Sequence, residues 1–198
     1  MSFYKTLQNT SSGFYKEKGS KFFAFAIPCE SEEEVKSHIN RMRKEHHLAV
    51  HVCYAFRLGS EKKKFRSSDD GEPSNTAGPP ILGQIISFDL TNILVAIVRY
   101  YGGTNLGVGG LIHAYRTAAK EAIENARIIE VEDHDLLHLT FTYGSLPQVM
   151  KVLKKYAIAT TNQLIDTTCK LEAKVPVSKK AFTHEITSIE GLEIVVES

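Results

Sequence analysis

The pattern of apolar and polar positions divides the chain into two regions with different orders of elements. In the first region, short apolar runs predict strands and apolar residues at helical spacing predict helices. The expected strands cover residues 22–27, 51–58 and 92–101, and the expected helices cover 32–46, 79–86 and 111–126. The run at 92–101 is nearly all apolar, which is typical of a central strand covered on both faces.

Beyond residue 127 the pattern predicts four strands and two helices. The expected strands cover residues 136–143, 158–165, 168–175 and 192–196. The expected helices cover 147–156, after the first strand, and 178–188, after the third. This βαββαβ order is that of a ferredoxin-like domain, a four-stranded sheet with two helices on one face. Residues 130–135 are the expected linker. We therefore predict the α+β class and two domains, residues 1–130 and 135–198.

Residues 59–80 are rich in turn-forming residues and have little periodicity, so we expect one long loop. Loops of that length in compact domains are often functional. Asp69, Asp70 and Glu72 place three carboxylates within four residues. That density suits a hard cation such as magnesium or paired acid and base chemistry. The alternative is a turn capped by its own aspartates.

A second candidate site is glycine-rich and lies between the apolar strand and the following helix. Five of the chain's 13 glycines fall within nine positions, at residues 102–110, the glycine loop. Exposed backbone N–H groups and a helix N-terminus together favour an anion. A tight turn without a ligand is the alternative. Candidate ligand-binding residues of both loops are Asp69, Asp70, Glu72, Arg99, Gly102, Gly103, Asn105, Gly107, Gly109, Gly110, His113 and Arg116, with possible support from His51, Tyr100 and Tyr115.

Charge and cysteine content narrow the class of protein. Lys and Arg total 24 against 23 Asp and Glu, so no global basic field drives nucleic-acid binding. Cys29, Cys53 and Cys169 form no Cys-x-x-Cys pair, which argues against a disulfide framework or a thiolate zinc site. Cys53, on a predicted strand, is expected to be buried and inert. With no long apolar run or secretory leader pattern, we expect a cytoplasmic protein without a membrane partner.

The two loop motifs occur together in an order that indicates a family. Residues 68–82 and 99–115 resemble the paired signature of the Impact family, also called the YigZ family after its bacterial branch. The resemblance extends to Gly-Ser-Lys-Phe at 19–22 and His-Val-Cys-Tyr-Ala at 51–55. The second region is similar to the appended domain of bacterial two-domain members. Paired long motifs are far more specific than a lone glycine pattern.

The resemblance implies a fold and a biological setting. It implies an N-terminal α/β sandwich like the second domain of a small-subunit ribosomal protein, and a ferredoxin-like domain similar to one in elongation factor G. Both likenesses point toward translation, and no established catalytic activity comes with the family. This chain has Asn75, Asn105 and His113 where Gly, Lys and Arg are common. Its attraction for a polyanion is therefore weaker than in the family pattern.

Three hypotheses follow. The first is a noncatalytic, translation-associated regulatory protein that binds RNA, a ribosomal element or a protein partner. The partner would bind in a cleft between the glycine loop and the acidic loop, which carries Asp69, Asp70 and Glu72. The second is an enzyme or sensor for a small phosphate-bearing or nucleotide ligand, with magnesium as its cofactor. No catalytic set is recognisable, which favours the first hypothesis, for which we expect no cofactor. In the third, both motifs only lock the fold.

Overall fold

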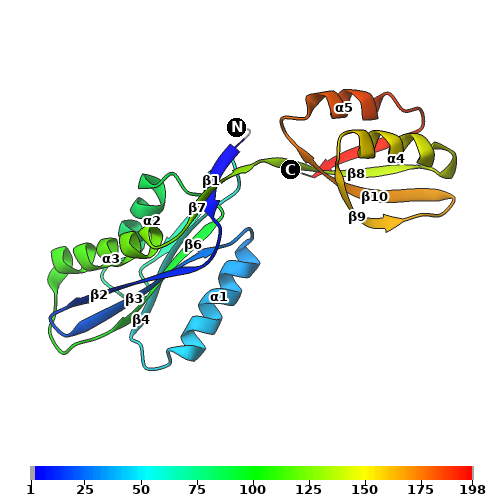
Figure 1. Cartoon of the computed structure of the whole chain (residues 1–198). Coiled ribbons are helices and arrows are strands. Elements are labelled where there is room, and N and C mark those ends of the chain that lie inside the picture. The colour runs from blue at the N-terminus through cyan, green and yellow to red at the C-terminus, as the bar shows by residue number, and fades with distance from the viewer. Residues whose placement is uncertain (1–2, 198) are drawn as a thin grey trace. The chain divides into compact units, whose positions relative to one another are not determined.

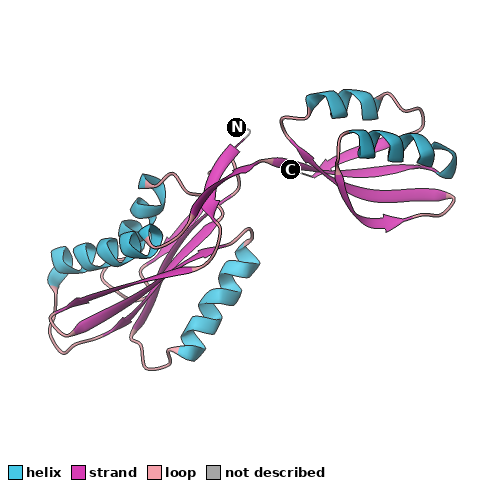
Figure 2. Ribbon diagram, in the orientation of Figure 1, coloured by secondary structure: helices cyan, strands magenta, loops and turns pink. Residues whose placement is uncertain are grey.

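The computed structural model describes residues 3–197, apart from the side chains of Lys180 and Glu197. The chain is built of two compact units that meet between Val131 and Glu132. Figure 1 shows both units, each a sheet with helices packed on it, and Figure 2 separates the strands from the helices by colour. The fold is mixed, with helices and strands in both units.

The first unit is organised around a five-stranded antiparallel sheet in the order β2-β3-β6-β4-β5. The central strand β6 pairs with β3 on one side and β4 on the other. Every residue of β6 except Tyr100 is buried, as its apolar sequence predicts. The strands are β2 (Ser11–Glu17), β3 (Ser20–Pro28), β4 (His51–Leu58), β5 (Lys64–Ser68) and β6 (Ile93–Tyr100).

Helices cover both faces of this sheet. Helix α1 (Glu32–Glu45) lies on one face, and α2 (Gly78–Ser87) and α3 (Gly107–Glu124) lie on the other. Ser31 is the N-cap of α1, because its Oγ accepts the Glu34 N–H at 3.2 Å. The two faces therefore have separate cores, one under α1 and one under α2 and α3.

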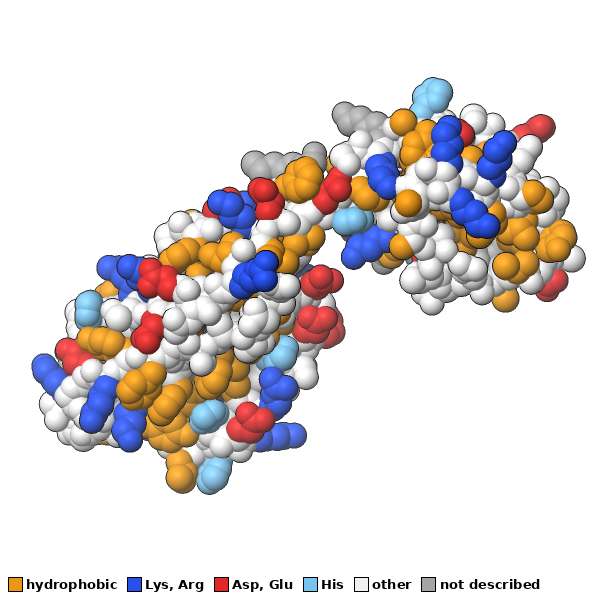
Figure 3. Space-filling model, in the orientation of Figure 1, with side chains coloured by type: hydrophobic (Ala, Val, Ile, Leu, Met, Phe, Trp, Pro, Cys, Tyr) orange, Lys and Arg blue, Asp and Glu red, His pale blue; other side chains and the backbone are white. Residues whose placement is uncertain are grey.

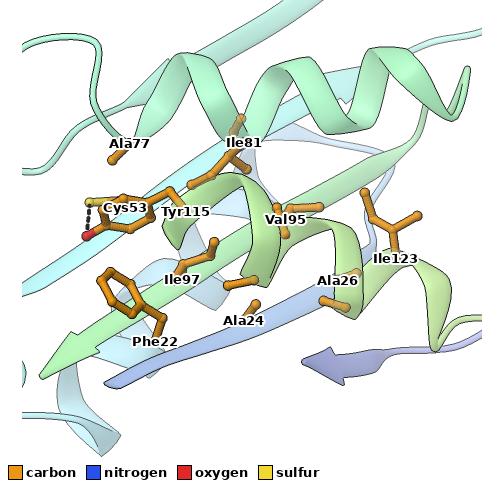
Figure 4. Close-up of a cluster of buried hydrophobic side chains, with 14 of the residues drawn as sticks. Phe22, Ala24, Ala26, Cys53, Ala77, Ile81, Val95, Ile97, Tyr115 and Ile123 are labelled. Atoms are coloured by element: carbon orange, nitrogen blue, oxygen red, sulfur yellow. Dashed lines mark hydrogen bonds between the residues drawn. The ribbon is translucent and has the colours of Figure 1, made fainter. Parts of the chain in front are cut away.

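The core under α3 depends on small residues. Alanines at 114, 118, 119 and 122 are fully buried, which lets the helix lie close to the sheet. At Gly13 of β2 a Cβ would lie 2.5 Å from the backbone nitrogen of Ala122, so only glycine fits there. Phe22, Ile81, Tyr115 and Ile123 all belong to this core, and Figure 4 shows Ile123 apart from the other three.

The second unit has the predicted order of elements. Its four-stranded antiparallel sheet has the order β11-β8-β10-β9. Helices α4 and α5 contribute to one core with this sheet, in which Val149 and Phe182 are fully buried. The elements are β8 (His134–Thr142), the short 3-10 helix Tyr143–Ser145, α4 (Leu146–Lys155), β9 (Ala159–Leu164), β10 (Thr168–Pro176), α5 (Lys180–Thr187) and β11 (Glu193–Glu197).

The structure differs from two expectations. The expected long loop at 59–80 contains strand β5, an edge strand whose Lys64, Phe65 and Arg66 are all exposed, so no alternation marks it. The boundary between the units falls within the expected linker at 130–135, but these residues lie mostly in strands, because β7 (Ile128–Glu132) pairs with β1 (Phe3–Leu7) and β8 begins at His134. Strands β1, β2 and β7 were not predicted, since they are short or mostly polar.

Within residues 3–197, the structure contains no helix with the length and apolar character needed to cross a membrane.

Candidate functional site

Asp69 holds the acidic loop, residues 68–78, in a fixed turn. Its carboxylate accepts the backbone N–H groups of Asn75 at 2.8 Å, Ala77 at 2.9 Å and Gly78 at 2.8 Å. Two of these donors lie at the start of α2, so Asp69 caps that helix from eight and nine residues upstream. Burial alone would raise the pKa of Asp69, but the three N–H donors outweigh it and hold the pKa below its ordinary value.

Asp70 ties the same loop to its neighbours. Its Oδ2 accepts the Val52 N–H of β4 at 2.7 Å, and its Oδ1 pairs with the Arg43 guanidinium of α1 at 2.5 Å. Its backbone carbonyl accepts a hydrogen bond from His51 Nδ1 at 2.7 Å, which fixes the proton of that ring on Nδ1. Asp70 has a positive φ of 43°, an arrangement that aspartate tolerates.

Glu72 and Arg99 form a buried ion pair beneath the loops. Arg99 Nη1 lies 2.6 Å from Glu72 Oε1, and the two residues are only 5% and 8% exposed. Tyr115 of α3 donates its hydroxyl to the same Oε1 at 2.7 Å. The other oxygen, Oε2, lies 3.8 Å from His51 Nε2. The Nε of Arg99 is buried and has no hydrogen-bond partner among the described residues.

Cys53 lies deeper, next to this pair. Its Sγ donates to the backbone carbonyl of Asp69 at 3.0 Å and to the Tyr115 hydroxyl at 3.3 Å, the bond drawn in Figure 4. Burial, with nearby carboxylates, raises the pKa of the thiol far above its ordinary value, although the hydrogen bond with Tyr115 opposes this. Cys53 is therefore a neutral, buried thiol, as predicted, and not a nucleophile.

The glycine loop begins with a close backbone approach. A Cβ on Gly102 would lie 2.0 Å from the carbonyl carbon of Gly19, so a side chain there would displace the β2–β3 turn. Ser20 accepts the Gly102 N–H at 3.1 Å with the same Oγ that accepts Arg99 Nη2 at 3.4 Å. Gly102 is thus a packing residue that positions Arg99.

The loop ends at the N-terminus of α3, which no side chain within residues 3–197 caps. Its N-cap residue Leu106 makes no side-chain capping bond, and the first turn contains no acidic residue. Val108 is 60% exposed, and Cβ atoms added at Gly107 or Gly109 would meet nothing within 4 Å. The first turn of this 18-residue helix therefore presents an open, partly positive end.

A cleft of about 480 Å³ separates the two loops, and we call it the loop cleft. Of the predicted site residues, the structure brings five together on its walls: His51, Glu72, Arg99, Asn105 and Gly107. Asn105 is held there by the Tyr101 hydroxyl, which donates to its Oδ1 at 3.0 Å. Its remaining walls are formed by Gly71, Pro73, Tyr101, Leu106, Val108 and Leu111.

The other predicted residues lie elsewhere or act indirectly. Tyr115 reaches the cleft only through Glu72. Tyr100 lies on the α1 face of the sheet and hydrogen-bonds to His46 at 2.9 Å. His113 is exposed on α3 with its ring 5.8 Å from that of Tyr15. Arg116 borders a separate groove with Asn75. Gly103, Gly109 and Gly110 flank the cleft, and Asp69 and Asp70 hold the loop behind it.

The acidic loop does not fit magnesium. Asp69 binds N–H groups at the start of α2, Asp70 binds β4 and α1, and Glu72 binds Arg99 and Tyr115. The three carboxylates thus turn to different elements instead of converging on one point, as a hard cation requires. The described residues contain no group of three or more His, Cys, Asp or Glu side chains placed to hold a metal ion.

Several residues of this region were not singled out from the sequence. Ser20 and Tyr101 position Arg99, and Val108 forms the exposed edge of the cleft. The Gly-Ser-Lys-Phe segment at 19–22 was noted only as part of the family pattern. The structure explains it, because Gly19 and Ser20 receive the glycine loop.

The fold and this region define a class: a two-unit α/β protein whose N-terminal unit holds a cleft between two interlocked loops. The Impact N-terminal domain model matches residues 18–123, which include both loops. The chain therefore belongs to the IMPACT family, as its motifs predict.

Relatives support this assignment along most of the chain. An IMPACT family member of Haemophilus influenzae is 31% identical over 188 residues, covering 91% of this chain and 89% of that protein. The IMPACT family member YigZ of Escherichia coli is 37% identical over 108 residues, covering 54% and 53%. The similarity to the first of these relatives thus extends beyond the residues that the domain model matches.

One solved structure agrees on the fold. A crystal structure described as a hypothetical protein matches with a TM-score of 0.81 and 26% identity, covering 100% of this chain and 98% of that one. A two-domain translational regulator, Yih1, matches with a TM-score of 0.37 over 62% of this chain and 47% of its own, which is too low to bear on function.

Proposed function

We propose that this chain is a noncatalytic, translation-associated regulatory protein, and that it binds an anionic group of its partner in the loop cleft. The partner is an RNA, a ribosomal element or a protein. Membership of the IMPACT family supports a role in translation, which is the setting that the family resemblance implies. The observation that carries the binding role is the first turn of α3, which lines the loop cleft and whose N–H groups no side chain of the described residues caps.

These donors suit a phosphate or carboxylate oxygen. The positive end of a helix and its free N–H groups are a common anion site. The charge of Glu72, which would repel an anion, is compensated by Arg99 at 2.6 Å. With Asn105 and exposed Tyr101 on the same walls, the cleft offers further hydrogen bonds and a ring surface.

The chemistry of the region supports binding over catalysis. Cys53 is a buried thiol with a raised pKa, and Tyr115 also has a raised pKa because of burial and the neighbouring Cys53 and Glu72. Neither group is poised to attack a substrate. The carboxylates needed for a magnesium-dependent enzyme are already engaged by protein donors. This favours the binding role over a small-ligand enzyme or sensor.

The finer fold assignments belong to the same proposal. We propose that the first unit is similar to the second domain of a small-subunit ribosomal protein and that the second unit is ferredoxin-like. The strand order β11-β8-β10-β9 supports the second assignment. A cytoplasmic location is part of the proposal.

The experiment is a binding measurement with purified ribosomes and structured RNA over a series of salt concentrations. We expect binding that weakens as salt increases, because phosphate contacts release counterions. Val108→Asp places a carboxylate in the first turn of α3 and should weaken binding, whereas the neutral Val108→Asn should leave it close to that of the wild type. Absence of salt-sensitive binding at low salt would contradict the RNA and ribosome forms of the proposal and leave a protein partner to be tested by cross-linking at residue 108.

A further inference from the structure

A second surface lies on the opposite face of the same sheet. Helix α1 leaves part of that face open over β2 and β3, where five rings form a continuous chain. Ring centroids are 4.9 Å apart for Phe14 and Phe23, 5.8 Å for Phe23 and Tyr100, 6.1 Å for Tyr100 and His46, and 6.0 Å for His46 and Phe25. We call these five residues the aromatic face.

The aromatic face is accessible. Phe14 is 44% exposed, and a hollow of about 450 Å³ runs beside Phe23, His46 and Tyr100. Figure 3 shows hydrophobic side chains gathered over this part of the first unit, with lysine and arginine side chains along its margin. Phe14 is exposed and the other four rings are partly exposed, and an apolar patch of this kind on a sheet marks an interaction surface.

Lysines border the aromatic face, and no carboxylate of the described residues forms an ion pair with them. Lys16 and Lys21 lie directly opposite each other on β2 and β3, and Lys18 lies in the turn between these strands. All three are exposed. Among the described residues, none of them forms an ion pair with a carboxylate, and Glu17 points to the other face, where it accepts the Tyr15 hydroxyl. Opposed like charges destabilise a strand pair, so a bound anion would relieve them.

We propose that the aromatic face binds an unpaired segment of RNA, with bases stacked on the exposed rings and phosphates beside Lys16 and Lys21. Recognition of a single strand has two components: aromatic rings on which the bases stack, and cationic side chains that lie along the phosphates. A duplex satisfies only the second component, because its bases are already stacked on one another. This inference goes beyond the proposed function, since it concerns a different face of the sheet and needs no group of the loop cleft apart from Tyr101, which borders both hollows.

The test measures fluorescence anisotropy of a labelled ten-nucleotide oligouridine and of a duplex of the same length. The protein is the full chain carrying Val108→Asp, so that the loop cleft is blocked, and wild type is measured in parallel. Base stacking contributes about 1–3 kcal/mol per base, which corresponds to roughly a 5- to 150-fold change in affinity. We expect Phe14→Leu to weaken oligouridine binding by at least about fivefold.

Matched variants separate stacking from charge and from unfolding. Phe65→Leu is the control, because Phe65 is also exposed, at 58%, but lies on β5 away from the aromatic face. The double substitution of Lys16 and Lys21 by Gln should reduce the slope of log K against log salt by about 1.4, or about 0.7 for each phosphate contact. Thermal unfolding of each variant shows whether it is folded.

The outcomes are distinct from those for the loop cleft. Preference for the single strand and a loss specific to Phe14→Leu, both retained in the Val108→Asp background, would support the aromatic face. Equal binding of the duplex, equal effects of Phe14→Leu and Phe65→Leu, or loss of oligouridine binding through Val108→Asp alone would overturn it. No oligouridine binding by the wild type at low salt would also overturn it, whatever the result with ribosomes.

Discussion

The acidic loop and the glycine loop face each other across one cleft, yet they use their polar groups in opposite ways. The three carboxylates of the acidic loop are already bound by donors within the protein. Asp69 and Asp70 accept backbone N–H groups, Asp70 also pairs with Arg43, and Glu72 binds Arg99 and Tyr115. The glycine loop ends in a helix turn that no side chain of the described residues caps. The acidic loop thus holds the scaffold, and the glycine loop leaves backbone N–H donors open.

This difference shows that a dense cluster of charged residues is no guide to an open site. The carboxylates look like ligands in the sequence because their spacing suits a cation. In the structure each meets its own donors, and the pair of Glu72 and Arg99 is nearly removed from solvent. The contrast predicts that substitutions in the acidic loop reduce stability, whereas substitutions in the first turn of α3 change binding.

The largest expected effect is that of Glu72→Ala. Removing this carboxylate leaves Arg99 buried without its charge partner and removes the acceptor for Tyr115. Breaking one side of a buried ion pair costs about 3–5 kcal/mol, so urea unfolding should show a loss of that size in the first unit.

Glu190→Ala, at an exposed position of the second unit, is the control for loss of a carboxylate. A decrease below about 1 kcal/mol for Glu72→Ala would mean that the ion pair is no more important than an exposed one.

Asp69→Ala should have the next largest effect. It leaves three backbone N–H groups without their acceptor, and two of them begin α2. Each buried group left unsatisfied costs about 1–3 kcal/mol, and partial access of water to Asn75 reduces the sum, so we expect a loss of about 2–3 kcal/mol in urea unfolding.

Asp69→Asn provides a graded comparison. Its amide oxygen can still accept the N–H groups of Ala77 and Gly78, whereas the bond from Asn75 is lost. The Asn variant should therefore fall between the wild type and the Ala variant. Equal loss in both variants would show that the charge of Asp69, and not its geometry, holds the loop.

A smaller effect concerns pH. The folded-state pKa of Asp69 lies below its ordinary value because backbone N–H donors stabilise the carboxylate against the effect of burial. The stabilisation is therefore complete above the unfolded pKa, near about 4, and is lost as the pH falls through the folded pKa. Wild-type stability, measured by urea unfolding from about pH 6 to pH 3, should decrease more steeply than that of Asp69→Ala. Parallel curves would contradict this role of Asp69.

Sequence patterns predicted much of this architecture, and the exceptions have physical causes. The apolar run of β6 and the capping residue Ser31 of α1 give strong local signals. Strand β5 gives none, because it is an exposed edge held by pairing with β4, a contact between residues distant in the chain.

The candidate site was predicted in position but not in detail. Pairing of the two motifs placed the cleft, and a turn capped by its own aspartate was one of the alternatives considered. The sequence alone cannot show that Tyr100 faces α1 while its neighbour Arg99 faces the cleft, because a strand alternates its faces and the register is set by β3 and β4. For the same reason the aromatic face was not predicted, since its rings come from β2, β3, β6 and the end of α1.

Substitutions of Val108 should change the stability least, although Val108→Asp should change binding most. Val108 is exposed in the first turn of α3, where a negative charge is favourable by about 0.3–1 kcal/mol. Val108→Asp and Val108→Asn should therefore both unfold within about 1 kcal/mol of the wild type.

The most direct test of the loop cleft compares these two variants in ribosome and structured-RNA binding at low salt. If an anionic group of the partner occupies the cleft, Val108→Asp weakens the binding while Val108→Asn, which lacks the added charge, retains most of it. Equal binding by the two variants and the wild type would contradict the claim that the glycine loop presents its donors to such a ligand.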